Sequence, residues 1–406
     1  MDAINALWIM VSAALVLLMV PGLALFYGGM GRSKNMLNML MMNVICLGIV
    51  PVVWITVGYS LSSNGGEGTS KWIGNLDSAF LRDVPLVEGT DSPLLLVFFA
   101  LTFACITPAL ISGAVADRMK FSAWVTFVPI WLLAVFVPAW AWVFRGNGFL
   151  QARGSLDFAG GTVVHVAAGA AALALVTVLG NRRGWPAEPM PPHNLPFTMI
   201  GAGLLWFGWF GFNAGSALAV DGVAVQAFVN TFVAGAIAML AWLVVEYILD
   251  GHATSLGAAS GIVAGLVAIT PGAGFMGTWG AAVVGFVAGI LCALAVRAKF
   301  KLGYDDAFDV VGVHLVGGLV GGVLIGVVAD SSVFGEVDKA KDGLLAGGSV
   351  HLLLEQIFAN IFVLLFSFVA TFIIAHAIKA TIGLRVSESD ETAGLDSALH
   401  AESAYN

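Results

Sequence analysis

The sequence predicts an all-α integral membrane protein with eleven transmembrane helices. Hydrophobic residues make up 59% of the 406-residue chain and charged residues only 10%, whereas a soluble domain carries about 25% charged residues. This composition excludes a soluble globular domain and a disordered chain. Acidic residues outnumber basic ones by 25 to 17, giving a net charge of −8, so the basic surface of a nucleic-acid-binding protein is also absent.

Eleven apolar runs supply the predicted helices, since a helix needs about 20 apolar residues to cross a hydrocarbon core of about 30 Å. The runs cover residues 6–28, 36–60, 93–116, 122–144, 158–180, 196–219, 223–249, 255–270, 276–297, 306–329 and 350–381. The eighth run is short and interrupted by glycine. Only the connections 61–92 and 330–349 are long, and both contain the Gly, Ser and Asp residues typical of surface loops.

The distribution of Lys and Arg orients the helices, because cytoplasmic loops carry an excess of both. With the N-terminus outside, eleven of these residues face the cytoplasm and six face outward. We therefore expect a multi-pass protein of the inner or plasma membrane, in contact with lipid and with a cytoplasmic C-terminus. Residues 385–406 are too charged to span a membrane and form a predicted cytoplasmic tail.

Two units of five helices resemble each other within a transmembrane domain of residues 1–384. The stretch Asp157-Phe158-Ala159-Gly160 precedes His165, and the stretch Asp309-Val310-Val311-Gly312 precedes His314. The predicted repeats cover about 6–180 and 196–329, and 350–381 forms an extra helix. An odd number of helices per unit inverts the second copy in the membrane. An inverted repeat indicates a transporter or channel with its pathway at the repeat interface.

Two histidines lie inside matching apolar runs. His165 is eight residues beyond Asp157, and His314 is five beyond Asp309. At 1.5 Å per residue, these offsets leave the histidines about 10 Å apart in depth in a core of about 30 Å. A packed core histidine is the simpler interpretation of each one, but their matching positions favour a pore-lining pair. Neutral imidazole offers one donor and one acceptor, which suits a small polar solute or a proton.

Other polar residues receive simpler interpretations. Asp157 is placed to cap a helix N-terminus, and its carboxylate can also favour a nearby cation. Glu246 and Glu355 are assigned structural roles near helix ends. No cluster of Cys, His and acidic residues has the spacing of a metal site, and no nucleophile with its base and acid is visible. We therefore expect no metal, no cofactor and no enzymatic activity.

Aromatic residues gather near the helix ends. They are Phe99, Phe103, Trp142, Phe144, Trp206, Trp209, Phe210 and Phe212. Membrane-interface belts explain most of them, but an aromatic vestibule can also hold a cation against its ring faces. Ser216, beside this cluster, can accept a hydrogen bond from such a cation.

Several motifs carry a resemblance to a known family. They are PGLALFYGG (21–29), FACIT (103–107), DFAGGTVVH (157–165), PHNLP (192–196), WFGFNAGS (209–216) and DVVGVH (309–314), with a tail that extends from 383 to 406. On these motifs the chain resembles the ammonium transporter (Amt/Rh) family, of the bacterial or archaeal Amt type, over nearly its whole length.

The resemblance implies a homotrimer of eleven-helix subunits, each with its own pore for ammonium and its analogue methylammonium. It implies recruitment of NH₄⁺ at an outer aromatic site, deprotonation, and conduction of NH₃, with or without the proton, past twin histidines. The implied residues are Phe103 and Ser216 at the outer site, Phe212 with Phe103 or Phe99 at a gate below it, the twin histidines His165 and His314, and Asp157 as the acid at the outer helix end. Phe144 aligns with the tryptophan of the bacterial sites, and Trp142 is a candidate to compensate for it.

The tail resembles the segment that is linked in this family to P-II regulatory proteins. An alternative function is an ammonium-binding sensor with little or no transport, which signals through a P-II-type partner. A Rhesus-type gas channel is disfavoured by the tail and by the absence of an added N-terminal helix. An intramembrane enzyme is disfavoured because no catalytic set is visible.

Overall fold

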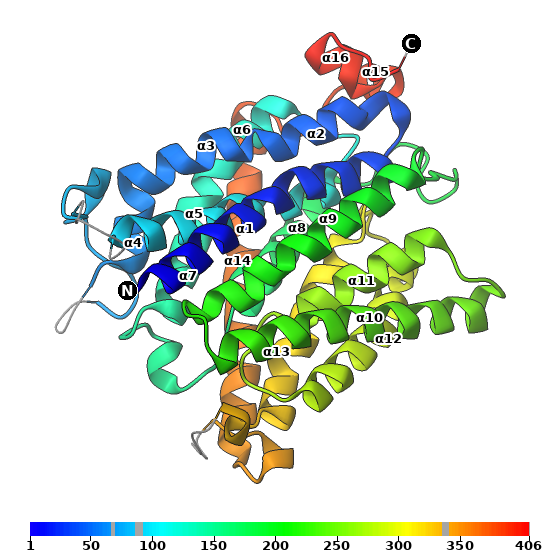
Figure 1. Cartoon of the computed structure of the whole chain (residues 1–406). Coiled ribbons are helices and arrows are strands. Elements are labelled where there is room, and N and C mark those ends of the chain that lie inside the picture. The colour runs from blue at the N-terminus through cyan, green and yellow to red at the C-terminus, as the bar shows by residue number, and fades with distance from the viewer. Residues whose placement is uncertain (66–69, 86–91, 335–340, 406) are drawn as a thin grey trace.

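The computed structural model describes residues 1–65, 70–85, 92–334 and 341–405, and within these ranges every regular element is helical. In the described part of the chain, ten helical segments are long and apolar enough to cross a membrane, and the shorter apolar helix α11 (Ser255–Ile269) brings the number to eleven. The predicted all-α, eleven-helix fold class is confirmed. The segments lie in a tilted bundle with the two chain termini at opposite ends (Figure 1).

The chain order of the helices follows the predicted runs. The helices are α1 (Ala3–Met30), α2 (Met36–Val44), α3 (Cys46–Val53), α4 (Tyr59–Ser63), α5 (Pro93–Ile111), α6 (Phe121–Trp131), α7 (Val137–Phe144), α8 (Ala167–Leu179), α9 (Leu195–Asn213), α10 (Gly222–Asp250), α11, α12 (Thr278–Leu302), α13 (Val316–Val328), α14 (Val350–Thr381), α15 (Glu388–Ala393) and α16 (Leu395–His400). Below, the end of the bundle that carries the N-terminus is called the outer end, and the end that carries the tail is called the inner end.

Among the described residues, wider π turns lie inside two of the membrane segments and open two others. Two of them, Trp54–Gly58 and Leu132–Phe136, follow Pro51 and Pro129 within the same segments. Proline removes a hydrogen bond to the turn before it, whereas these π turns begin three residues after the prolines. The other two π turns are η7 (Gly161–Val166) and η9 (Val311–Leu315), and each carries one of the predicted histidines.

Small residues bring the two repeats into close contact. Helices α1 and α9, the first helices of the two repeats, lie side by side (Figure 1). A methyl group added at Gly201 would lie 2.3 Å from the backbone nitrogen of Phe26, which is closer than any side chain allows. Gly169 faces Leu315 in the same way, at 2.4 Å. Close packing through glycine is typical of membrane helices, and here it brings the two histidine-bearing segments together.

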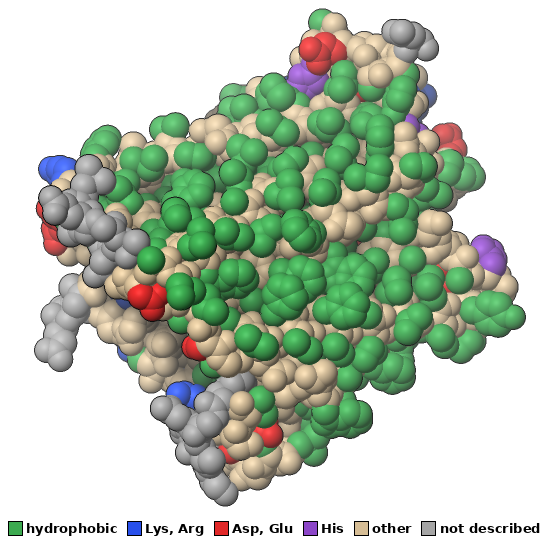
Figure 2. Space-filling view, in the orientation of Figure 1, with side chains coloured by type: hydrophobic (Ala, Val, Ile, Leu, Met, Phe, Trp, Pro, Cys, Tyr) green, Lys and Arg blue, Asp and Glu red, His purple; other side chains and the backbone are tan. Residues whose placement is uncertain are grey.

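Helix α14 runs behind the bundle at an angle to α1, α9 and α10 (Figure 1). Its Ser367 donates to the carbonyl of Ala167 at 2.7 Å, and its Thr371 accepts from the indole of Trp131 at 2.9 Å. The surface between the two ends of the molecule is a broad apolar band, and the charged side chains in view lie toward those ends (Figure 2). This distribution suits a protein that spans a membrane.

A buried ion-pair network joins the inner-end loops. Arg182 donates to both carboxylate oxygens of Asp305 at 2.9 and 2.8 Å, and Arg32 donates to Asp117 at 2.9 Å. Burial alone would raise the pKa of Asp305, but the hydrogen bonds from Arg182 and the charges of Arg182 and Arg118 hold it below its usual value. The network connects loops of both repeats.

The C-terminal tail is folded onto these loops. Asp396 accepts hydrogen bonds from the backbone N–H groups of Leu37 and Asn38, at 3.1 and 2.8 Å, at the start of α2. Glu391 accepts from the backbone of Arg183 at 2.7 Å, and the hydroxyl of Tyr405 lies 2.8 Å from the imidazole of His193. Asn406, which belongs to the predicted tail, lies outside the described residues.

Candidate functional site

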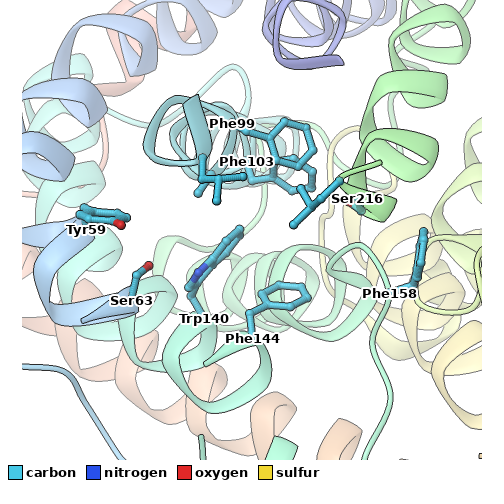
Figure 3. Close-up of a pocket in the computed structure, with 11 residues that line it drawn as sticks. Tyr59, Ser63, Phe99, Phe103, Trp140, Phe144, Phe158 and Ser216 are labelled. Atoms are coloured by element: carbon cyan, nitrogen blue, oxygen red, sulfur yellow. The ribbon is translucent and has the colours of Figure 1, made fainter. Parts of the chain in front are cut away.

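A cavity of about 310 Å³ opens at the outer end of the bundle. It is lined by Tyr59, Ser63, Leu96, Phe99, Ala100, Phe103, Trp140, Phe144, Phe158, Ser216 and Leu218. Phe103, Phe144 and Ser216 were all predicted for an outer site, and Figure 3 shows them around this cavity. The cavity is therefore walled mainly by aromatic rings, with a few hydroxyl groups among them.

Trp140, and not the predicted Trp142, supplies the tryptophan of this cavity. The ring centroid of Trp140 lies 4.7 Å from that of Phe144 and 6.0 Å from that of Phe103. Trp142 points elsewhere: its indole donates to the carbonyl of Trp72 at 2.7 Å. Residues four apart share a helix face, whereas residues two apart do not. The spacing of Trp140 and Phe144 was a usable signal in the sequence.

A phenylalanine stack lies below the cavity. The rings of Phe103 and Phe212 are 4.2 Å apart between centroids, and Phe99 meets the edge of Phe103 at 5.0 Å. Phe103 lines the cavity and Phe212 does not, so Phe103 is the residue that joins the cavity to the interior. The hydroxyl of Ser216 donates to the carbonyl of Phe212 at 2.8 Å. The lone pairs of Ser216 can therefore accept a hydrogen bond from a ligand.

The two histidines meet directly beneath this stack. Their Nδ1 atoms are 3.3 Å apart and their ring centroids 5.3 Å apart, and both side chains are buried. His165 also lies 6.0 Å from Phe212, centroid to centroid. A neutral pair at this distance shares one hydrogen bond, with one Nδ1 protonated and the other accepting. The depth gap of about 10 Å expected from helical rise does not occur, because the two histidine-bearing turns contact each other directly.

Asp157 caps the π turn that carries His165. Its carboxylate accepts from the N–H groups of Gly160 and Gly161, both at 2.8 Å, and from Thr162 at 2.7 Å. Gly160 has a φ of +104°, which only glycine adopts readily. Asp157 also lines a second outer cavity, of about 480 Å³, together with Phe144 and Phe158. Asp157 therefore caps the π turn and also faces the second outer cavity.

The two glutamates in apolar runs have protein partners. Glu246 accepts from the backbone of Thr254 at 3.0 Å, at the start of α11, and Glu355 forms a two-pronged ion pair with Arg153 at 2.8 Å for each bond. Both arrangements satisfy the carboxylate without a ligand.

The predicted residue pairing of the two repeats is wrong by three residues. Asp306, and not Asp309, occupies the position of Asp157. Asp306 accepts a hydrogen bond from the N–H of Val311, and Asp157 accepts one from the N–H of Thr162; in both cases the donor lies five residues onward and the distance is 2.7 Å. Asp309 instead takes the place of Gly160 and has a φ of +64°. The predicted pairing was wrong because the string that begins at Asp309 is similar in letters to the string that begins at Asp157. The hydrogen bonds pair Asp157 with Asp306.

Comparison with known proteins covers the whole chain. The sequence model described as Ammonium Transporter Family matches residues 7–405. The chain is 50% identical over 435 residues to the ammonium transporter of Mycobacterium tuberculosis (strain ATCC 25618 / H37Rv), covering 100% of this chain and 91% of that protein. It is 44% identical over 401 residues to the ammonium transporter Amt1 of Archaeoglobus fulgidus, covering 99% of each.

Solved structures agree with this relationship. The crystal structure of Saccharomyces cerevisiae Mep2 matches with a TM-score of 0.87 and 33% identity, over 96% of this chain and 88% of that one. A structure named Sensor Amt Protein matches with a TM-score of 0.89 and 29% identity, over 98% of both chains. The curated relatives are transport proteins, and on the family match and these identities the chain belongs to the ammonium transporter family.

Proposed function

We propose that this protein transports ammonium by recruiting NH₄⁺ at the outer aromatic cavity, deprotonating it, and conducting NH₃ past His165 and His314, whether or not the proton follows along the histidines. The observation that carries the proposal is the stacking order: an aromatic cavity, a closed Phe103–Phe212 pair, and a buried, hydrogen-bonded histidine pair beneath it. Family membership supports the substrate.

Each layer has a physical role in this proposal. The aromatic rings attract a cation by their electron-rich faces, and Ser216 accepts one of its N–H bonds. Below the stack the surroundings are apolar, so a bare cation would carry a large desolvation cost. NH₄⁺ can avoid that cost by releasing a proton, whereas K⁺ cannot lose its charge. Deprotonation therefore favours ammonium over K⁺.

The direct test is uptake by cells that lack their own ammonium transporters. Expression of this chain is expected to restore growth on low ammonium and to produce uptake of labelled methylammonium, which ammonium should inhibit. An empty vector and a His165→Ala/His314→Ala variant that accumulates in the membrane are the controls. Correctly inserted protein that gives no uptake above the vector would contradict the proposal.

Trp140→Leu is expected to weaken the outer site. A tryptophan–cation contact contributes about 1 to 2 kcal/mol, so half-maximal uptake should need about 5- to 30-fold more ammonium, with a smaller change in the maximal rate. Trp206→Leu is a matched control, because that tryptophan stacks on Phe232 and does not line the cavity. An unchanged half-saturating concentration, or an equal shift in the control, would refute the assignment of Trp140.

A sensor is the second candidate function. The match to the structure named Sensor Amt Protein favours it, and so does the tail, which is folded onto inner-end loops where a partner has access to it. In this form the protein binds ammonium at the same outer cavity, transports little or none, and signals through a P-II-type partner. Saturable ammonium binding without flux would distinguish the sensor from the transporter.

We further propose a homotrimer in the inner or plasma membrane, in contact with lipid and with its N-terminus outside and its tail in the cytoplasm. The apolar outer faces of α10 and α12 include the exposed side chains of Phe232, Leu240, Trp279 and Phe286 and offer area for lipid or for a neighbouring subunit. Native mass spectrometry of the detergent-solubilised protein is expected to give a mass three times that of the chain.

Removal of residues 385–406 is expected to abolish P-II regulation or to impair transport through lost coupling between subunits. Residues within this segment bond to α2 and to the loop at Arg183, so its loss changes the inner surface on which a partner would dock. Full-length protein should bind the P-II protein of the same cell in pull-down, with an affinity that depends on ATP, ADP and 2-oxoglutarate. Unchanged P-II binding together with unchanged transport in the deletion would exclude this role.

A further inference from the structure

The inner histidine has a carboxylate cap that mirrors the cap of the outer one. Asp306 precedes His314 by eight residues, as Asp157 precedes His165. In both copies a carboxylate oxygen accepts from the N–H five residues onward at 2.7 Å. In both copies the residue three positions beyond the aspartate has a positive φ, and its carbonyl accepts from the N–H four residues later. The two π turns thus begin with the same arrangement of capping hydrogen bonds.

The two caps differ in how many of their carboxylate oxygens accept hydrogen bonds. Asp157 uses both carboxylate oxygens, whereas Oδ1 of Asp306 is buried and has no hydrogen-bond partner among the described residues. Lys299 does not fill the gap, because it donates to the backbone carbonyl of Asp306 and to Asp309. Oδ1 of Asp306 therefore remains a buried acceptor without a donor in the described part of the chain. A fold that keeps such a group buried bears a cost in stability.

We propose that Asp306 is a positioning residue for His314: its carboxylate fixes the start of the π turn that aims the inner imidazole at the outer one. The inference rests on the proposed function, since it concerns selectivity for ammonium. A π turn redirects the side chains that follow it around the helix. The Nδ1–Nδ1 distance of 3.3 Å leaves little tolerance, because a hydrogen bond weakens steeply with distance and misalignment.

The neighbouring contacts hold the end of this turn more firmly than its start, so a change at the start can alter the conformation of the turn. Gly169 packs against the backbone of Leu315 just beyond His314, so the far side of the turn is held by the first repeat. On the near side, Val311 N–H has the Asp306 carboxylate as its acceptor. Loss of that acceptor leaves a buried N–H unpaired, and the turn can then relax toward ordinary α geometry and rotate His314.

The test compares the ratio of ammonium influx to K⁺ influx in proteoliposomes, measured per correctly folded protein. Asp306→Ala is expected to lower this ratio by about tenfold or more, the effect also expected of His314→Ala, and the double variant is expected to be no worse than either single one. Asp306→Asn keeps an acceptor for Val311 and is expected to retain the wild-type ratio within about threefold. If Asp306→Ala does not accumulate, Asp306→Leu, which also lacks an acceptor, replaces it.

Glu246→Ala is the matched control, because it removes a buried carboxylate from the start of α11, a helix without a histidine. It is expected to affect protein yield or stability without changing the ion ratio. A wild-type ratio in Asp306→Ala or Asp306→Leu would overturn the inference, as would effects of Asp306 and His314 that multiply in the double variant, or a folded Asp306→Asn that has lost selectivity. Absence of ammonium influx in the wild-type protein would instead refute the proposed function.

Discussion

Replacement of His165 or His314 by Ala is expected to reduce ammonium flux or to admit K⁺, without unfolding the protein. Each substitution removes one partner of the shared hydrogen bond and opens space for water beneath the Phe103–Phe212 stack. Loss of a positioned proton-transfer group costs about 10²- to 10⁴-fold in rate, so the change in the flux ratio should be large. Ammonium and K⁺ influx into proteoliposomes measure it.

The control for this prediction is the oligomeric mass and thermal stability of each variant, which should match the wild type. If both histidine variants conduct ammonium and reject K⁺ as the wild type does, the histidines are packing residues and the proposed relay is wrong.

Asp157→Ala is expected to be more damaging than Asp157→Asn. The carboxylate accepts three backbone N–H bonds, and each buried N–H left unpaired costs about 1 to 3 kcal/mol. The alanine variant should therefore unfold at a markedly lower temperature, while Asn retains one acceptor oxygen and loses the charge and the second acceptor. Thermal unfolding of the purified variants measures this difference, and equal stability of the two would contradict the capping role.

Transport by Asp157→Asn then separates the two interpretations of this residue. A folded Asn variant without transport would show that the negative charge helps to recruit the cation. Full transport by the same variant would reduce Asp157 to a structural cap.

The membrane fold was predictable from the sequence because the bilayer imposes a simple rule. Runs of about 20 apolar residues have few alternatives to a spanning helix, and α11 was identified as the short one. The odd number of helices in each unit then requires the inversion. Neither step depends on the detailed packing of any side chain.

The geometry of the site was less predictable because it depends on where helices depart from regular form. The gap of about 10 Å between the histidines counted the depth of His314 from Asp309, whereas the equivalent of Asp157 is Asp306, three residues earlier. It also assumed a uniform helical rise, whereas both histidines lie in π turns. The caps left one local signal, an aspartate eight residues before each histidine. It was missed because the string that begins at Asp309 matched the string at Asp157 by letters alone.

The assignment of Trp142 was a different kind of error. Trp142 was named because it lies two positions before Phe144, but helical periodicity places Trp140, four positions before, on the face of Phe144. The partners of the tail could not be predicted from the sequence, because its contacts join residues about 360 positions apart: Asp396 to Asn38, and Leu395 to Asn35. Local turn signals cannot identify such partners.

The central claim is that the stacked site moves ammonium across the membrane and excludes K⁺. The most direct measurement is influx of ¹⁵N-ammonium and of a K⁺ tracer into proteoliposomes of the wild-type protein, at a mildly acidic pH that limits passive NH₃ leakage. Ammonium influx that saturates and exceeds that of protein-free vesicles, with K⁺ influx equal to theirs, is the predicted result. Ammonium influx no faster than in protein-free vesicles, from protein that still binds ammonium, would contradict the claim and favour the sensor.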